Sequence, residues 1–168
     1  MTDLGKMGWI LGIRVTHNHD KGMIALLQEK FIRETLECYG MSDTRPISTP
    51  TLANKHLHKL LSPKVNTKSY QHALGSLMYP MLATCPDLGY AIAALGCHAT
   101  NSGPDHQCAL EHVFRYLRAT SDHQLILRHS ASGSSSLLGY TDADWASDVN
   151  DRKSTSGYVF MLGNSAIS

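Results

Sequence analysis

Hydrophobic positions follow a strand-like pattern near the N-terminus and then change to a helical spacing. Residues 9–15 and 23–27 are rich in strand-forming side chains, and the polar residues 17–22 between them have the composition of a turn. These segments predict a β-hairpin. Apolar residues recur at helical spacing over 31–39, and Gly40 is well placed to end that helix because glycine adopts the left-handed backbone of helix ends.

A long connection and further helices follow the hairpin. Residues 41–66 contain three prolines and many polar side chains, which indicates a surface connection rather than a regular element. A helical stripe begins at Tyr70 and is predicted to break near Pro80 or Pro86, because proline lacks the amide hydrogen that a helix needs. Residues 87–98, apolar on most sides, predict a third helix.

A fourth helix is predicted from its start signal at 102–105, where a proline suits the first turn and an acid is favoured near the positive helix end. Its polar face carries Arg115 and Arg118, and Glu111 lies at the spacing for an ion pair with Arg115. The helices between 67 and 119 are expected to share one core. Its predicted members are Leu74, Leu77, Met78, Ile92, Leu110, Phe114 and Leu117.

Strand-like patterns return from residue 124 onward. Residues 124–129, 136–145 and 155–162 are separated by polar turns, and another strand begins at 166–168. The fold class is therefore α+β, with an N-terminal hairpin, a helical cluster and then antiparallel strands. An antiparallel sheet of the three later segments, or of a subset of them, is expected, with Asp142 projecting from the middle of the sheet.

Composition and charge narrow the function classes. A hydrophobic content of 42% is enough for a packed core, so the 168-residue chain is not a disordered tail. The net charge is +1, but residues 131–168, with two basic and four acidic side chains, carry −2 against +3 for the preceding part. The four cysteines are scattered, which is typical of a reduced intracellular chain. The N-terminal residues do not indicate a signal peptide. No membrane span is indicated either, because prolines and Asp87 interrupt the least charged stretch of the chain.

Asp142 and Asp144 are the candidates for metal-dependent chemistry. They follow an apolar run at a spacing that places both carboxylates on one face of a strand. A nuclease that uses two Mg²⁺ ions needs several such carboxylates, and Asp142 suits one of these positions. No Asp, Glu or His follows Asp151, so residues 152–168 cannot complete the set. An exposed strand aspartate without catalytic role is the alternative.

Two further possibilities are weaker. Five His and Cys side chains lie close together in sequence, but their spacing matches no common zinc motif. These are Cys97, His98, His106, Cys108 and His112. His17 and His19 suit a solvated turn, and no motif for a nucleophile or a phosphate loop is present, so no small-molecule substrate is expected. Arg115 and Arg118 could contact phosphates, although a solvated helix face is the simpler explanation.

Five stretches in order resemble the Pol polyprotein of copia-like LTR retrotransposons. "DLGKMGWILGIRV" is similar to the family's "DLG…FLGI.V" segment after the polymerase palm, and "MSDTRPISTP" to its "KPVSTP" connection. "YQHALGSLMYPMLATCPDLGYAIAAL" resembles "Y…VGSLMYL…TRPDI.YAV..L", and "HVFRYLRAT" resembles "LRYLKGT". "GYTDADWASDVNDRKSTSGYVFMLG" is similar to the start of the family's ribonuclease H, "GYSDADWAGD..DRRSTSGY.F.LG".

The resemblance implies a fragment of a reverse transcriptase and ribonuclease H. Residues 1–123 would be the end of the reverse transcriptase, with a primer-grip hairpin and thumb or connection helices, and 124–168 the first strands of an incomplete ribonuclease H-like domain. Asp142 would be the first ribonuclease H carboxylate and a Mg²⁺ ligand in an intact site. The family's other carboxylates, in "YVDD" and "S.TEAEY", have no counterpart here, so neither activity nor bound Mg²⁺ is expected of this chain.

The same resemblance implies an RNA–DNA hybrid or primer–template duplex as partner. Trp9, Leu11 and Gly12 would belong to the primer grip, where a glycine allows close approach to a phosphate; a glycine at a twist of the hairpin is the alternative. Three positions depart from the family pattern: Cys85 replaces arginine, Pro80 an aliphatic residue and Ala119 a glycine. A domesticated, non-catalytic nucleic-acid-binding or interaction module is the alternative function.

Overall fold

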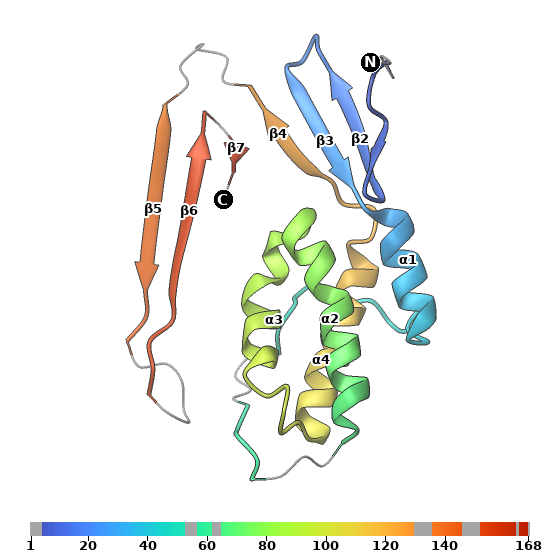
Figure 1. Cartoon of the computed structure of the whole chain (residues 1–168), viewed down its shortest axis with the longest axis vertical. Coiled ribbons are helices and arrows are strands. Elements are labelled where there is room, and N and C mark those ends of the chain that lie inside the picture. The colour runs from blue at the N-terminus through green and yellow to red at the C-terminus, as the bar shows by residue number, and fades with distance from the viewer. Residues whose placement is uncertain are drawn as a thin grey trace. The chain divides into compact units, whose positions relative to one another are not determined.

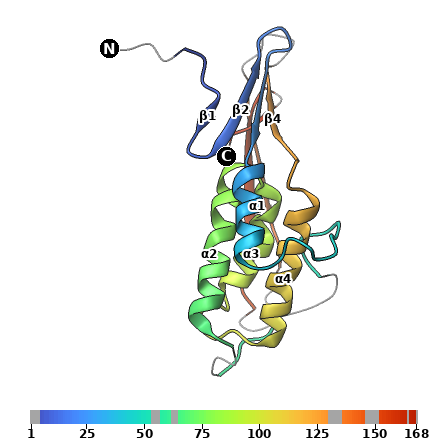
Figure 2. The same ribbon diagram turned by 90° about the vertical axis from the view of Figure 1, so that its right-hand side faces the viewer.

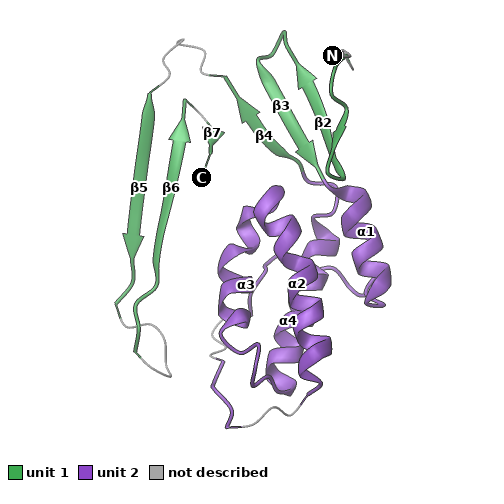
Figure 3. Ribbon diagram, in the orientation of Figure 1, with its two compact units in different colours: residues 1–27, 124–168 green, residues 28–123 purple. Residues whose placement is uncertain are grey.

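The structure, a computed structural model, describes residues 5–52, 57–61, 65–129, 136–145, 152–163 and 165–167. It divides the chain into two compact units, one formed by residues 1–27 and 124–168 and the other by residues 28–123 (Figure 3). Sheets make up the first unit and helices the second (Figure 1). The predicted α+β class is confirmed. The assignment of 1–123 and 124–168 to two ancestral domains concerns descent and stays a prediction.

The first sheet contains four antiparallel strands in the order β1-β2-β3-β4. They are β1 (Trp9–Ile10), β2 (Ile13–Asn18), β3 (Met23–Leu27) and β4 (Leu125–Arg128). The pairing of β2 with β3 confirms the predicted hairpin. β4 pairs with β3, and Met23 lies opposite Arg128. The sequence pattern grouped β4 with the later strands, but the structure places it in this first sheet.

The prediction of one strand over 9–15 is wrong in detail, because the chain reverses within it. Leu11 and Gly12 have positive φ angles of 49° and 78°, which is the backbone of a two-residue hairpin turn. β1 therefore folds back on β2, with Ile10 opposite Ile13 (Figure 2). A tight turn with an exposed tip replaces the expected continuous strand.

The second sheet contains β5 (Leu137–Ala143), β6 (Ser156–Leu162) and β7 (Ser165–Ala166) in that order. All pairs are antiparallel, so the predicted pairing of the later strands holds for β5 and β6. Ser165 links this sheet to β4, since its hydroxyl accepts a hydrogen bond from the Arg128 N–H at 2.6 Å and donates one to the Arg128 carbonyl at 3.1 Å.

The helical unit contains α1 (Glu29–Cys38), α2 (Thr67–Ala83), the 3₁₀ turn η1 (Pro86–Leu88), α3 (Gly89–Gly96) and α4 (Pro104–Ala119). Gly40 ends α1 as predicted, with φ +64°, while its N–H bonds the Glu37 carbonyl and the Met41 N–H bonds the Leu36 carbonyl. This pattern is a Schellman motif. The described residues of the connection 41–66 form no helix or strand, in agreement with the sequence.

Pro80 does not break its helix, so of the two break points that the sequence left open, Pro86 is the one that the structure shows. It lies in the last turn of α2, where its missing N–H leaves only one carbonyl, that of Ser76, without an intrahelical donor. The Pro80 carbonyl accepts from both the Thr84 and Cys85 N–H groups, which closes the helix three residues later. Pro86 is the actual boundary, because it opens η1.

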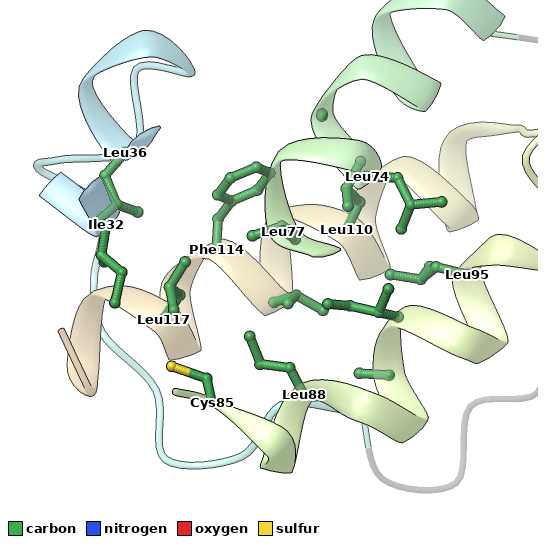
Figure 4. Close-up of a cluster of buried hydrophobic side chains, with 14 of the residues drawn as sticks. Ile32, Leu36, Leu74, Leu77, Cys85, Leu88, Leu95, Leu110, Phe114 and Leu117 are labelled. Atoms are coloured by element: carbon green, nitrogen blue, oxygen red, sulfur yellow. The ribbon is translucent and has the colours of Figure 1, made fainter. Parts of the chain in front are cut away.

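One hydrophobic cluster holds the helical unit together, and side chains of α1, α2, α3 and α4 converge in it (Figure 4). Six of the seven predicted core residues are buried. These are Leu74, Leu77, Ile92, Leu110, Phe114 and Leu117. Met78 is the exception: it is 46% exposed, because the buried stripe of α2 runs through Ala73, Leu77 and Pro80 and leaves Met78 at its edge.

Candidate nucleic-acid interface

Asp142 lies on the surface, next to the last residue of β5. It is opposite Gly157 of β6, and in the described part of the sheet β5 is an edge strand with all seven residues exposed. The expectation of a position in the middle of the sheet is therefore wrong. The Asp142 carboxylate accepts a hydrogen bond from the Ala143 N–H at 2.9 Å. This contact lies within its own strand and brings no second acidic group to the site.

The described residues do not fit a two-magnesium site. Asp144, the nearest carboxylate in sequence, accepts a hydrogen bond from the Thr155 N–H at 2.6 Å and so fixes the end of the β5–β6 ribbon. Asp148 and Asp151 lie outside the described residues. Within the described ranges, no group of three or more His, Cys, Asp or Glu side chains is arranged to hold a metal ion. One carboxylate binds Mg²⁺ weakly, because this ion gives up its water reluctantly.

The sequence cluster of His and Cys residues is not gathered into a ligand set. Cys97 and Cys108 are exposed, whereas His98 and His106 are buried with ring centroids 4.2 Å apart. The His106 Nδ1 accepts a hydrogen bond from the Gly103 N–H at 2.9 Å, which satisfies one free donor at the start of α4. His106 is thus used as a helix-capping residue.

Cys85, which occupies the family's arginine position, has no features of a nucleophile. It is buried, and burial raises the pKa of its thiol, against a smaller opposing effect of the Thr84 hydroxyl 3.6 Å away. A thiol with a raised pKa is protonated at neutral pH and therefore unreactive. The Cys85 side chain contributes to the core of the helical unit.

The β1–β2 turn presents the most prominent exposed apolar residues of the predicted binding site. Trp9 is 58% exposed and Leu11 is 82% exposed. Gly12 has a positive φ, and among the described residues other than its two chain neighbours no atom lies within 4 Å of the position that a Cβ would take there. The turn backbone therefore accounts for the glycine, while the open space around it leaves room for a ligand.

Arg14 belongs beside these residues, although the sequence did not single it out. It lies directly opposite Trp9 in the β1–β2 register, so both side chains are on one face of the sheet, and both are exposed. The only signal that could have revealed the pair is the turn at Leu11, because the register follows from where the chain reverses. An indole next to a guanidinium offers both a stacking surface and a positive charge.

Arg115 and Arg118 lie in the helical unit, on α4. The Arg115 Nε–H donates to the Arg45 carbonyl at 2.8 Å, and Glu111 instead accepts from Gln107, so the predicted Glu111–Arg115 ion pair is not formed. His112, one turn earlier, donates to the Thr49 carbonyl at 2.9 Å. Burial lowers the pKa of His112, and the nearby Arg115 charge acts in the same direction. Arg115 and His112 thus attach the connection after α1 to α4.

No helix in the described part of the chain has the length and apolar character of a membrane span. Fold and side chains together define a mixed α+β chain that has candidate binding residues on a hairpin and on a helix. Within the described ranges, no group of three or more metal-binding side chains surrounds Asp142, where an active site is predicted.

Comparisons with known proteins find relatives among transposon polyproteins and one shorter protein. The chain is 38% identical over its whole length to the retrovirus-related Pol polyprotein from transposon TNT 1-94 of Nicotiana tabacum, and 35% identical over 85% of its length to that from transposon RE2 of Arabidopsis thaliana. It is also 43% identical, over 59% of its length and 68% of the relative, to the secreted RxLR effector protein 161 of Plasmopara viticola. No family model and no solved structure matches.

The chain is therefore homologous to copia-like retrotransposon Pol polyproteins over most of its length. It spans 13% of the TNT 1-94 polyprotein and 10% of the RE2 polyprotein.

Proposed function

We propose that the chain is the part of a Pol polyprotein that joins the reverse transcriptase to its ribonuclease H, and that it binds nucleic acid without cutting or copying it. The Trp9–Arg14 pair on the β1–β2 turn is the observation that carries the proposal. An exposed indole stacks on bases, and an exposed arginine neutralises a phosphate. The motif order of the family, with the primer-grip segment first and the ribonuclease H segment last, supports the same assignment.

The ligand is a duplex with an accessible end, either an RNA–DNA hybrid or a primer–template. A two-residue turn is a narrow structure whose exposed tip, Leu11–Gly12, can approach a backbone closely. Trp9 and Arg14 form the second residue pair from the tip, so one hairpin supplies stacking and charge together. Arg118, half-buried on α4, is a second candidate for a phosphate contact.

Binding is tested with a fluorescent RNA–DNA hybrid that carries a single-stranded overhang, titrated with purified protein at several salt concentrations. Trp9→Ala should weaken binding by about 5- to 150-fold, the equivalent of a stacking contact of ~1–3 kcal/mol. Arg14→Ala should reduce the slope of log affinity against log salt by about one.

Two variants serve as matched controls. Tyr90→Ala removes an exposed aromatic ring from the helical unit, and Arg33→Ala removes one positive charge from α1. Both should leave binding within about threefold, since neither lies on the hairpin. Equal losses in the controls and in the hairpin variants would show that general charge, rather than the hairpin, holds the nucleic acid.

The second part of the proposal is that the chain has no catalytic activity of its own. A hybrid incubated with the protein and Mg²⁺ should stay intact, because among the described residues Asp142 belongs to no group of three or more metal-binding side chains. A protein extended through the family's "TEAEY" segment and later aspartates should cut the hybrid, and Asp142→Asn should abolish that cutting. Cleavage by the 168-residue chain itself, lost in Asp142→Asn, would contradict the proposal.

A second candidate is an interaction module that works apart from any polymerase. It is supported by the relative from Plasmopara viticola, of which the chain spans 68% at 43% identity, since that relative is far shorter than a Pol polyprotein. Failure of the chain to bind any duplex, with an intact fold, would favour this candidate over the first.

A further inference from the structure

We propose that His17 and His19 form a two-imidazole site for a divalent transition-metal ion, Cu²⁺ or Zn²⁺, at the tip of the β2–β3 hairpin. His17 lies in β2, and His19 is the first residue of the turn that follows this strand. Their ring centroids lie 3.7 Å apart. This is the closest approach of two imidazoles among the described ring pairs, and it occurs on the surface rather than in a core.

The turn that carries the two rings is fixed by its own hydrogen bonds. The Asn18 side-chain oxygen accepts from the Lys21 N–H at 3.0 Å, and the His19 carbonyl accepts from the Gly22 N–H at 3.1 Å. Gly22 has φ +51°, a conformation that glycine adopts without strain. The turn backbone is thus held in place before the ion arrives, so that mainly the two side chains have to be ordered on binding.

The chemistry of the pair selects the ion. Neutral imidazole nitrogens suit Cu²⁺, Zn²⁺ and Ni²⁺, and for a given set of nitrogen ligands Cu²⁺ binds more tightly than the other two. Both rings are exposed, so they can open by a small side-chain rotation to place one nitrogen each at the ~2.0–2.1 Å that a Zn–N bond requires. Asp20, in the same turn, adds a negative charge near the ion, and Lys21 next to it offsets that charge.

The ligand number follows from what surrounds the turn. His129, at the end of β4, donates its N–H to the Gly22 carbonyl at 2.8 Å, and its Cβ lies 3.1 Å from where a Gly22 Cβ would be. It is thus a neighbour of the turn, but within the described ranges no three metal-binding side chains are assembled into one group. Two imidazoles therefore bind the ion and water completes its coordination.

The test is a calorimetric titration of CuCl₂, and separately of ZnCl₂, into the purified full chain without an affinity tag. His17→Ala and His19→Ala should each lower the Cu²⁺ affinity by roughly tenfold or more, because loss of either ligand ends chelation. His17→Thr, which keeps a strand-forming residue in β2, should do the same and excludes a folding effect. His123→Ala, which removes an exposed histidine from the other unit, should change the affinity by less than about threefold.

A second measurement locates the ion directly. On addition of Zn²⁺, the ring resonances of His17 and His19 should shift together in NMR spectra, while those of the buried His98 and His106 stay unchanged. Unaltered Cu²⁺ affinity in the His17→Ala/His19→Ala double variant would overturn the site. A loss in His129→Ala as large as that in His17→Ala would overturn the two-ligand assignment.

Discussion

Replacement of Leu117 by alanine tests whether the helical cluster is a real core. Leu117 is 0% exposed and lies on α4 among side chains of the other helices (Figure 4). The change removes three carbon groups, and at ~0.8 kcal/mol for each buried group the transfer term is ~2.4 kcal/mol. A cavity that the surrounding helices cannot fill adds up to ~2 kcal/mol. We therefore expect the free energy of unfolding to fall by about 2–5 kcal/mol.

The assay is urea denaturation followed by the far-UV circular dichroism of the helices. Tryptophan fluorescence is unsuitable, because Trp9 and Trp145 both belong to the sheet unit and not to the helical unit. Leu82→Ala is the matched control: it makes the same chemical change on α2, but at a side chain that is 77% exposed, and should cost under about 0.5 kcal/mol. A loss for Leu117→Ala no larger than that of the control would refute the core assignment.

Three further predictions concern single positions in the helical unit. Tyr70→Phe should lower stability by about 0.5–1.5 kcal/mol in chemical denaturation, since the buried hydroxyl donates to the Leu95 carbonyl at 3.1 Å. Burial also raises the pKa of Tyr70 to about 12, so the wild type should lose stability as the pH rises from 10 towards 12. The Tyr70→Phe variant should lose less stability over the same pH range. The pKa of His112 is lowered by burial, so its contribution to stability is complete above pH 6.5 and is lost as the pH falls below that value; thermal melts of His112→Gln should depend less on pH in this range. Gly40→Ala should lower the stability of the protein by about 1 kcal/mol, because Gly40 has a positive φ. Gly75→Ala, inside α2 with open space around it, should raise the stability by about 0.5–1 kcal/mol. Melting temperatures of the two variants that move in the same direction would contradict this.

Local patterns were sufficient to predict most of the helical unit. The 3.6-residue period located α1, α2 and α4, and Gly40 and Pro86 marked real boundaries, because each acts through the backbone of its own neighbourhood. The failure at Met78 has a physical cause. This residue is at the edge of the α2 stripe, where packing against other helices, rather than the period, decides whether a side chain is buried.

Strand pairing was less predictable, because it depends on residues far apart in sequence. The alternation of 124–129 indicated a strand correctly, but nothing in that segment shows that its partner is β3, about a hundred positions earlier. The same limit applies to the candidate binding site. The Trp9–Arg14 pair exists because Leu11, a residue that rarely takes a positive φ, joins Gly12 in a tight turn, and no common hairpin signal marks that dipeptide.

The position of Asp142 connects the stability of the second sheet to its chemistry. β5 is exposed at every residue, including Leu137, Leu138 and Tyr140, so pairing with β6 is its main support. Ribbons of this kind are marginally stable unless a further strand or a helix covers a hydrophobic face. A two-metal site needs carboxylates held rigidly around the ions, which an uncovered edge strand does not provide. Under the proposed function, the segment that supplies further carboxylates to Asp142 is therefore expected to cover this ribbon as well, so that activity and local stability are gained together.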